Sequence, residues 1–395
     1  MFIPRKINQC DVFVVLWGLY YLQGLLYPQG VINQMIQLLM IFIGLFSFFK
    51  CLMMPMPCLM RATTALVFMY AVYGTAIILF GDGISWTTDS TYLKNSLNSL
   101  LPIFFFFLQT KCGNLTEKRI KIYTLLMTAC VIIFYTYFGR KMLSQLGVEE
   151  TTNNVGYMFV TLIPFVFFYY KTPIVQYALL AVLMMYILMG MKRGAILIGV
   201  MSVIIFLYSG FKEGTFKQKT LVLILSILTV IGSIYVVDYM LETSDYFANR
   251  VESTMDGDSS GRDRIYSSVW DAIKYEQRIV PILFGHGANS TIKYAGNFAH
   301  QDWLETACNN GLLGLSILLI FFVAFCRIVW RSKRQLPSHY YYCFLTLFAI
   351  SLSKTMFSMS IQNFNMYQGM LIGYFTYLVS DNRTLLSNQE TARSL

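Results

Sequence analysis

Long apolar stretches follow one another along almost the whole chain, and they constrain its fold more than any motif does. A membrane-spanning helix needs about 20 mostly apolar residues. The composition agrees, because 56% of the residues are hydrophobic and only 13% are charged, whereas about 25% of a soluble domain is charged. We predict an all-α polytopic membrane protein with about twelve transmembrane helices, at residues 11–27, 31–49, 62–80, 95–110, 120–138, 154–170, 173–190, 194–210, 219–241, 306–329, 339–357 and 364–380.

Several other classes of protein are disfavoured by what the sequence contains. The net charge of +10 is not gathered into a basic face interleaved with aromatic residues, so no nucleic-acid partner is expected. Most of the eight cysteines lie in apolar runs, without the spacing of a metal site. No GxxxxGK[ST] segment occurs, and the predicted spans hold almost no carboxylates for a proton relay. We therefore expect no metal and no cofactor.

The basic residues are better explained as topology signals, because cytoplasmic loops of membrane proteins are rich in Lys and Arg. If the N-terminus is cytoplasmic, the predicted cytoplasmic segments hold 18 of these residues and the short loops on the other side hold 6. This split predicts that both termini are cytoplasmic. It also places the longest loop, residues 242–305, outside the cytoplasm.

That loop differs in composition from the rest of the chain, since it carries ten of the twenty acidic residues and two of the three histidines. Ile265, Val269 and Ile273 recur at helical spacing and predict an amphipathic helix over 262–277. The expected organisation is a transmembrane bundle of nine helices (1–241), an extracytoplasmic, periplasmic loop (242–305), three more transmembrane helices (306–381) and a cytoplasmic tail (382–395).

Two pairs of basic residues at the predicted outer face are candidates for binding an anion. Lys192 and Arg193 stand at the outer end of the eighth predicted helix, where the positive-inside rule disfavours them. Arg262 and Arg264 follow an acidic turn. A planar guanidinium is well suited to clamp a diphosphate. The ordinary alternatives are snorkelling to the interface for the first pair and local ion pairs for the second.

His300, a few residues before the tenth predicted helix, is the candidate general base, since an imidazole has a suitable pKa for that role. The alternative is a histidine that only caps the helix. Asp302 or Glu305 would orient or replace it as the base, and His286, between two glycines, is a further candidate.

Two more polar positions lie at predicted outer helix ends. Asn154, within TTNNVGYMF, is a candidate for binding sugar hydroxyls, with helix capping as the alternative. Lys354, near the end of the span at 339–357, is a candidate anion contact.

Taken in order, these segments resemble the O-antigen polymerase and O-antigen ligase superfamily. KRGA opens a helix and is followed by SGRDRIYSSVWDAI, FGHGANS and AHQDWLETACNNGLLGL. The superfamily pattern is His followed by Asn, Ser or Gln, nine residues and GxxG. Here His300 and Gln301 are followed by nine residues and then by Gly311 and Gly314. The resemblance covers roughly residues 150–315 by motif and the whole chain by topology.

The resemblance implies a metal-independent glycosyltransferase of GT-C-like helical architecture in the bacterial inner membrane. Its donor would be an oligosaccharide linked to undecaprenyl diphosphate, and a chain-length regulator and a flippase would be partners. Arg193 and Arg262, with Arg264, would hold the diphosphate, and His300 would act as base or acceptor contact. The chain departs from the family in having Gln after this histidine, where Asn is commonest, and Lys before Arg193, where Ser or Thr is frequent.

Three functions remain open at this level. The first is a polysaccharide polymerase that transfers a growing O-antigen or exopolysaccharide chain to a new lipid-linked repeat unit. The second is a ligase that transfers the chain to lipid A–core. The third is a lipid-linked sugar transporter without covalent chemistry, which the large ordered outer loop and the lack of inverted repeats disfavour.

Overall fold

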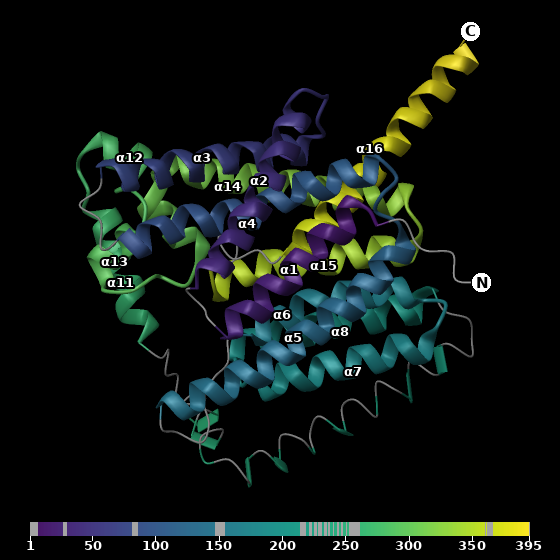
Figure 1. Ribbon diagram of the computed structural model, residues 1–395, viewed down its shortest axis with the longest axis horizontal. Coiled ribbons are helices and arrows are strands. Elements are labelled where there is room, and N and C mark those ends of the chain that lie inside the picture. Colours follow the sequence, from purple (N-terminus) through teal and green to yellow (C-terminus); the bar gives the residue numbers. More distant parts are fainter. Residues whose placement is uncertain are drawn as a thin grey trace.

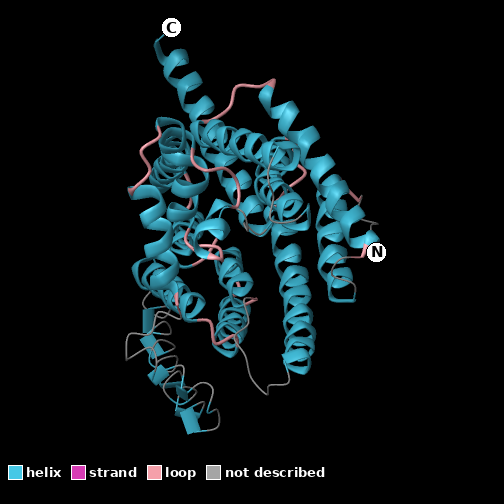
Figure 2. Ribbon diagram, turned by 90° about the vertical axis from the view of Figure 1, so that its left-hand side faces the viewer, coloured by secondary structure: helices cyan, strands magenta, loops and turns pink. Residues whose placement is uncertain are grey.

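The computed structural model describes residues 7–26, 30–80, 86–146, 155–213, 261–359, 361 and 366–394, with scattered residues between 219 and 252. Every regular element bounded within these ranges is a helix, so the all-α prediction is confirmed for them (Figures 1 and 2). The elements are α1 (Gln9–Leu26), α2 (Val31–Leu52), α3 (Cys58–Phe80), α4 (Trp86–Lys111), α5 (Glu117–Leu146), α6 (Gly156–Leu162), the 3-10 helix η1 (Ile163–Tyr169), α7 (Pro173–Met189), α8 (Arg193–Glu213), α11 (Arg262–Lys274), α12 (Ile279–Phe284), α13 (Ser290–Ala295), α14 (Asp302–Gln335), α15 (Ser338–Phe357) and α16 (Met366–Ser394).

The chain is an α-helical membrane protein. Among the described residues, five helical segments are long and apolar enough to cross a membrane: Val31–Leu52, Cys58–Phe80, Glu117–Tyr137, Arg193–Glu213 and Asp302–Gln335. Their outer faces stay apolar, as on α2, where Met35, Phe42 and Phe46 are 62–66% exposed. Continuous exposed apolar surface of this kind indicates contact with lipid rather than with water.

Each predicted span outside 219–241 overlaps a helix of the structure, and the ninth predicted span falls mostly outside the described residues. The stretch predicted at 154–170 is not one α-helix. It changes from α6 into η1 at Ile163, next to Pro164. A proline removes a backbone donor and so disturbs the α-helical hydrogen-bond pattern. The count of twelve spans stays a prediction.

Many of the long helices lie side by side, with α2, α3, α4 and α14 in the upper part of Figure 1 and α5, α7 and α8 in the lower part. The short helices α11, α12 and α13 gather at one end. We call this the site end; α14 begins there at Asp302 and reaches the opposite end at Gln335. Residues 382–394, predicted to form a tail, continue α16, which extends away from the bundle (Figures 1 and 2). The segment predicted as an amphipathic helix over 262–277 contains α11, with Val269 fully buried and Trp270 55% exposed.

Close contact between α4 and α16 depends on two glycines of α16. A Cβ atom added at Gly373 would lie 2.5 Å from the Ile103 carbonyl oxygen and 2.6 Å from the Phe107 nitrogen. At Gly369, one turn earlier, it would lie 3.0 Å from the Pro102 Cβ. Glycines four residues apart let transmembrane helices approach backbone to backbone. α4 also packs against α2 and α3, so it is the helix that joins α2, α3 and α16.

We predict that Gly373→Ala separates α4 from α16 and destabilises the protein by about 1–3 kcal/mol, the usual cost of overpacking. Thermal unfolding in detergent measures the effect as a lower melting temperature. Gly18→Ala is the matched control, since its Cβ would lie 3.6 Å from the Cys130 sulfur, an ordinary contact distance. Equal melting temperatures for both variants would contradict the close packing.

Candidate functional site

The start of α14 is broken, and the break fixes the loop that precedes it. Gly311 has φ 63° and ψ −159° inside this helix. The carbonyl oxygens of Cys308 and Asn309 accept hydrogen bonds from the backbone N–H groups of His286 (2.8 Å) and Gly287 (3.0 Å). A Cβ at Gly311 would overlap the backbone at Gly285, and a Cβ at Gly285 would overlap the backbone of α14. The glycine-rich turn and the GxxG segment therefore meet backbone to backbone.

Two buried carboxylates hold the chain on either side of His300. Glu305 accepts hydrogen bonds from the Thr291 hydroxyl (2.6 Å) and from the Ala299 N–H (2.8 Å). Asp302 accepts one from the Ile361 N–H (3.0 Å). Both side chains are only 3% exposed. These carboxylates anchor the backbone around the histidine, rather than lining an open site beside it.

A cavity of about 540 Å³ lies at the site end, where α6, α8, α11, α14 and α15 end or begin. It is rich in cationic groups, and no Asp or Glu is among its described lining residues, which are Tyr157, Met158, Lys192, Arg262, Phe298, His300, Lys354, Phe357, Ser358 and Met359. We call it the cationic cavity. Three basic side chains and an imidazole from four separate segments share one space, which is an arrangement suited to an anion.

Contacts between the helices hold the lining of the cationic cavity in place. Arg262 donates a hydrogen bond to the Phe357 carbonyl oxygen (3.4 Å), which joins the start of α11 to the end of α15. The Lys354 ammonium lies over the Tyr157 ring, 5.9 Å from its centre. The Trp303 indole N–H donates to the Thr355 hydroxyl (2.9 Å) and joins α14 to α15. The cationic side chains therefore come from elements that are tied together.

Backbone strain is concentrated at the same place. Within the described residues, three positions other than glycine have positive φ, and two of them are His300 (φ 52°) and Met191 (φ 49°), directly before Lys192. A left-handed backbone is costly for a side chain as large as these, and it persists where the surrounding structure imposes it. Gln301, not His300, caps α14, since its side chain accepts a hydrogen bond from the Leu304 N–H (3.0 Å).

The imidazole of His300 stays neutral more readily than an exposed histidine. Burial lowers its pKa first, and the positive charges of Arg262 and Lys192 lower it further. At neutral pH a ring nitrogen is therefore free of a proton and able to accept one.

The predicted site residues separate into two groups. Lys192, Arg262, His300 and Lys354 meet in the cationic cavity. The others do not line it. Arg193 is half-buried beside the cavity at the start of α8, and Arg264 is exposed on α11. Asn154 lies outside the described residues.

His286 belongs to a separate cluster. Its Nδ1 atom lies 3.0 Å from the Tyr294 hydroxyl and 3.8 Å from a Glu276 carboxylate oxygen. That carboxylate is held by Arg278 at 2.8 Å. The polar partners of its side chain are therefore on the loop itself, and His286 does not line the cationic cavity.

Tyr157 and Gly194 were not among the predicted site residues, yet both shape the cavity. A Cβ at Gly194 would overlap the Tyr157 hydroxyl, so this glycine leaves the space in which the tyrosine reaches the cavity. No hydrogen-bond partner is found among the described residues for that buried hydroxyl. Nothing local in the KRGA segment indicates this contact, because it depends on Tyr157 in a different helix.

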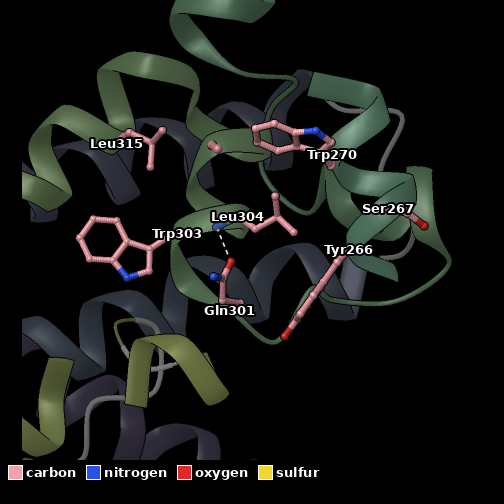
Figure 3. A pocket seen from close by; sticks show the side chains of 8 residues that line it. Tyr266, Ser267, Trp270, Gln301, Trp303, Leu304 and Leu315 are labelled. Carbon is pink, nitrogen blue, oxygen red and sulfur yellow. Dashed lines mark hydrogen bonds between the residues drawn. The ribbon is translucent and has the colours of Figure 1, made fainter. Parts of the chain in front are cut away.

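An apolar groove of about 560 Å³ adjoins the cationic cavity. Tyr266 and Trp270 of α11 line it on one side, and Trp303 and Leu304 of α14 on the other. Figure 3 shows Leu304 between the two tryptophans. Residues of α11 and of the segment 298–304 line both the groove and the cavity. The neighbouring residues His300 and Gln301 line the cavity and the groove, respectively.

Neither models of known protein families nor the curated proteins compared with the chain gave a match. A function for the cavity therefore has to be inferred from its own chemistry. Among the described residues, no group of three or more His, Cys, Asp or Glu side chains is placed to hold a metal ion.

We predict that the NMR titration midpoint of His300 lies below the ordinary pKa of histidine and rises in Arg262→Gln, because one nearby positive charge is removed. The chain has three histidines, so His300→Gln assigns the signal. Lys274→Gln, an exposed charge at the far end of α11, is the control and leaves the midpoint unchanged. An unchanged midpoint in Arg262→Gln would contradict the coupling.

Proposed function

We propose that the protein is a polysaccharide polymerase that transfers a growing glycan from undecaprenyl diphosphate to a new lipid-linked repeat unit. The observation that carries the proposal is the cationic cavity beside the apolar groove. A lipid diphosphate has the matching character, with an anionic head and an apolar chain. Guanidinium and ammonium groups stabilise a diphosphate without a metal ion.

The mechanism follows from the cavity's own side chains. The acceptor hydroxyl oxygen forms a bond to the anomeric carbon while the bond from that carbon to the diphosphate oxygen breaks. His300 takes the hydroxyl proton on an imidazole nitrogen. Negative charge grows on the departing undecaprenyl diphosphate and is stabilised by Arg262, Lys192 and Lys354.

The protonation state of His300 sets the expected pH dependence. Its pKa is lowered by burial and then by Arg262 and Lys192, so the neutral base persists below the ordinary histidine pKa. Activity that depends on this base is therefore retained as the pH falls through the ordinary pKa. It is lost only as the pH falls through the lower pKa of the folded protein.

The proposal includes the topology predicted from charge. The site end would face the extracytoplasmic side of a bacterial inner membrane, with twelve spans in a GT-C-like arrangement. A lipid diphosphate in the outer leaflet would then meet Arg262 and His300 at the membrane surface, while its chain follows the groove beside Trp303. The resemblance to O-antigen polymerases and ligases supports this proposal. We prefer the polymerase to the ligase on the basis of that resemblance alone.

We predict that Arg262→Gln shortens the polysaccharide ladder to single repeats and lowers turnover at least about 100-fold, the usual scale for losing a transition-state charge contact. Gel analysis of polysaccharide from a complemented deletion strain measures it. Lys274→Gln removes the same charge from the exposed end of α11 and keeps the full ladder. Full-length product from Arg262→Gln, at matched expression, would remove the diphosphate clamp.

The deletion strain itself separates the candidate reactions. Loss of a polymerase leaves lipopolysaccharide capped with one repeat unit, and this is the result we expect. Loss of a ligase leaves polymer attached to undecaprenyl diphosphate, and loss of a transporter leaves repeat units on the cytoplasmic leaflet. Either of these last two products would overturn the polymerase assignment.

A further inference from the structure

A second cavity of about 490 Å³ lies at the opposite end of the bundle, and it also gathers basic side chains. Arg61 comes from the first turn of α3, Lys111 is the last residue of α4, and Arg327 and Arg331 belong to the last third of α14. The one carboxylate in its described lining is Asp381 of α16. Four basic groups thus face one acidic group in a single cavity.

This cavity is remote from the candidate active site. α14 begins at the site end with Asp302, and Arg327 is 15 residues beyond Leu312, which follows the break in this helix. At about 1.5 Å per residue, that stretch alone covers about 22 Å. The second cavity therefore cannot hold the same bound head group as the cationic cavity.

The cations of the second cavity are not neutralised by ion pairs within the described part of the chain. None of the ion pairs found there involves Arg61, Arg327 or Arg331. The Lys111 ammonium lies 3.1 Å from the Met54 sulfur, which carries no charge. Asp381 is hydrogen-bonded to Tyr377. The excess positive charge is therefore available to an external anion.

Part of the remaining lining is apolar. Met56, Phe107, Ile328 and Val379 share the cavity with the basic side chains. Met53, at the end of α2 beside it, is 79% exposed. A ligand that places a phosphate against the cations and hydrocarbon against the exposed helix faces would contact both parts.

The positive-inside rule explains why basic residues occur at this end, but it does not require them to share a cavity. Lys333 and Arg334 make the contrast clear. They lie on the same helix as Arg327 and Arg331 and are exposed, yet they do not line the cavity. Lys333 and Arg334 meet the positive-inside rule as well as Arg327 and Arg331 do, without sharing a cavity.

We propose that this second cavity binds the phosphate head group of an anionic membrane phospholipid. Basic pockets between transmembrane helices are known to hold such head groups. The shared chemistry is a phosphate bearing one or two negative charges. The lipid is favoured over free phosphate because apolar side chains line the same space.

The test compares two double variants of the purified, full-length protein in nanodiscs or detergent. Arg327→Gln with Arg331→Gln removes two charges from the cavity, and Lys333→Gln with Arg334→Gln removes two from the same helix outside it. Binding of phosphatidylglycerol, with phosphatidylcholine as the neutral lipid, is measured by native mass spectrometry. We expect about tenfold weaker phosphatidylglycerol binding in the first variant and less than a twofold change in the second, with phosphatidylcholine unaffected.

Three outcomes would overturn the proposal. Equal loss in both double variants would indicate general surface charge rather than a site. Retained binding in the first variant would show that the cavity is not used. Binding of inorganic phosphate that is as tight as that of phosphatidylglycerol, and that displaces it, would identify a free anion as the ligand.

A second pair of substitutions guards against a folding defect. Arg61→Gln with Lys111→Gln changes the same cavity from α3 and α4, and it should weaken phosphatidylglycerol binding to a similar extent. The melting temperature of each variant without added lipid is the folding control. Wild-type binding in this variant, with an unchanged melting temperature, would also overturn the proposal.

Discussion

Gly311 interrupts α14 at the site end, and the carbonyl groups released by this break are bonded by the backbone of the loop at 285–287. Unpaired carbonyls in an apolar setting are costly, so the loop and the helix stabilise each other. The buried carboxylates of Asp302 and Glu305 then fix the segment between them and the loop. His300 has little freedom within that segment, and its positive φ is imposed by anchors on both sides.

A single helix, α11, contributes to both the cationic cavity and the apolar groove. α11 presents Arg262 to the cationic cavity from its first turn and presents Tyr266 and Trp270 to the apolar groove from the next two turns. A ligand with an anionic head and a long apolar chain would contact both surfaces without moving the helix. This division of one helix between two surfaces is the main structural reason for proposing a lipid diphosphate.

Much of the fold could be predicted from the sequence, because long apolar stretches leave few alternatives to membrane helices. Candidate residues were harder to assign to roles. Lys192 and Arg193 are adjacent, yet only the lysine, which directly follows the positive φ of Met191, lines the cavity. Asp302 and Glu305 are close to His300 in sequence, yet both are used as backbone anchors. Their burial depends on packing from distant segments, which local sequence does not reveal.

The break in the GxxG segment was not predicted from the sequence. Gly311 interrupts α14 there so that another backbone can approach it. Tyr157 was missed because its position depends on Gly194, a residue on a different helix. The segment 219–241 and Asn154 fall outside what the structure describes, so their predicted roles stay predictions.

The most direct test of this account is an experimental structure of the protein with undecaprenyl diphosphate bound. We expect the diphosphate to lie within hydrogen-bonding distance of Arg262 and Lys192, and the isoprenoid chain to lie along Trp270 and Trp303. A diphosphate bound elsewhere, with the cationic cavity unoccupied, would contradict it.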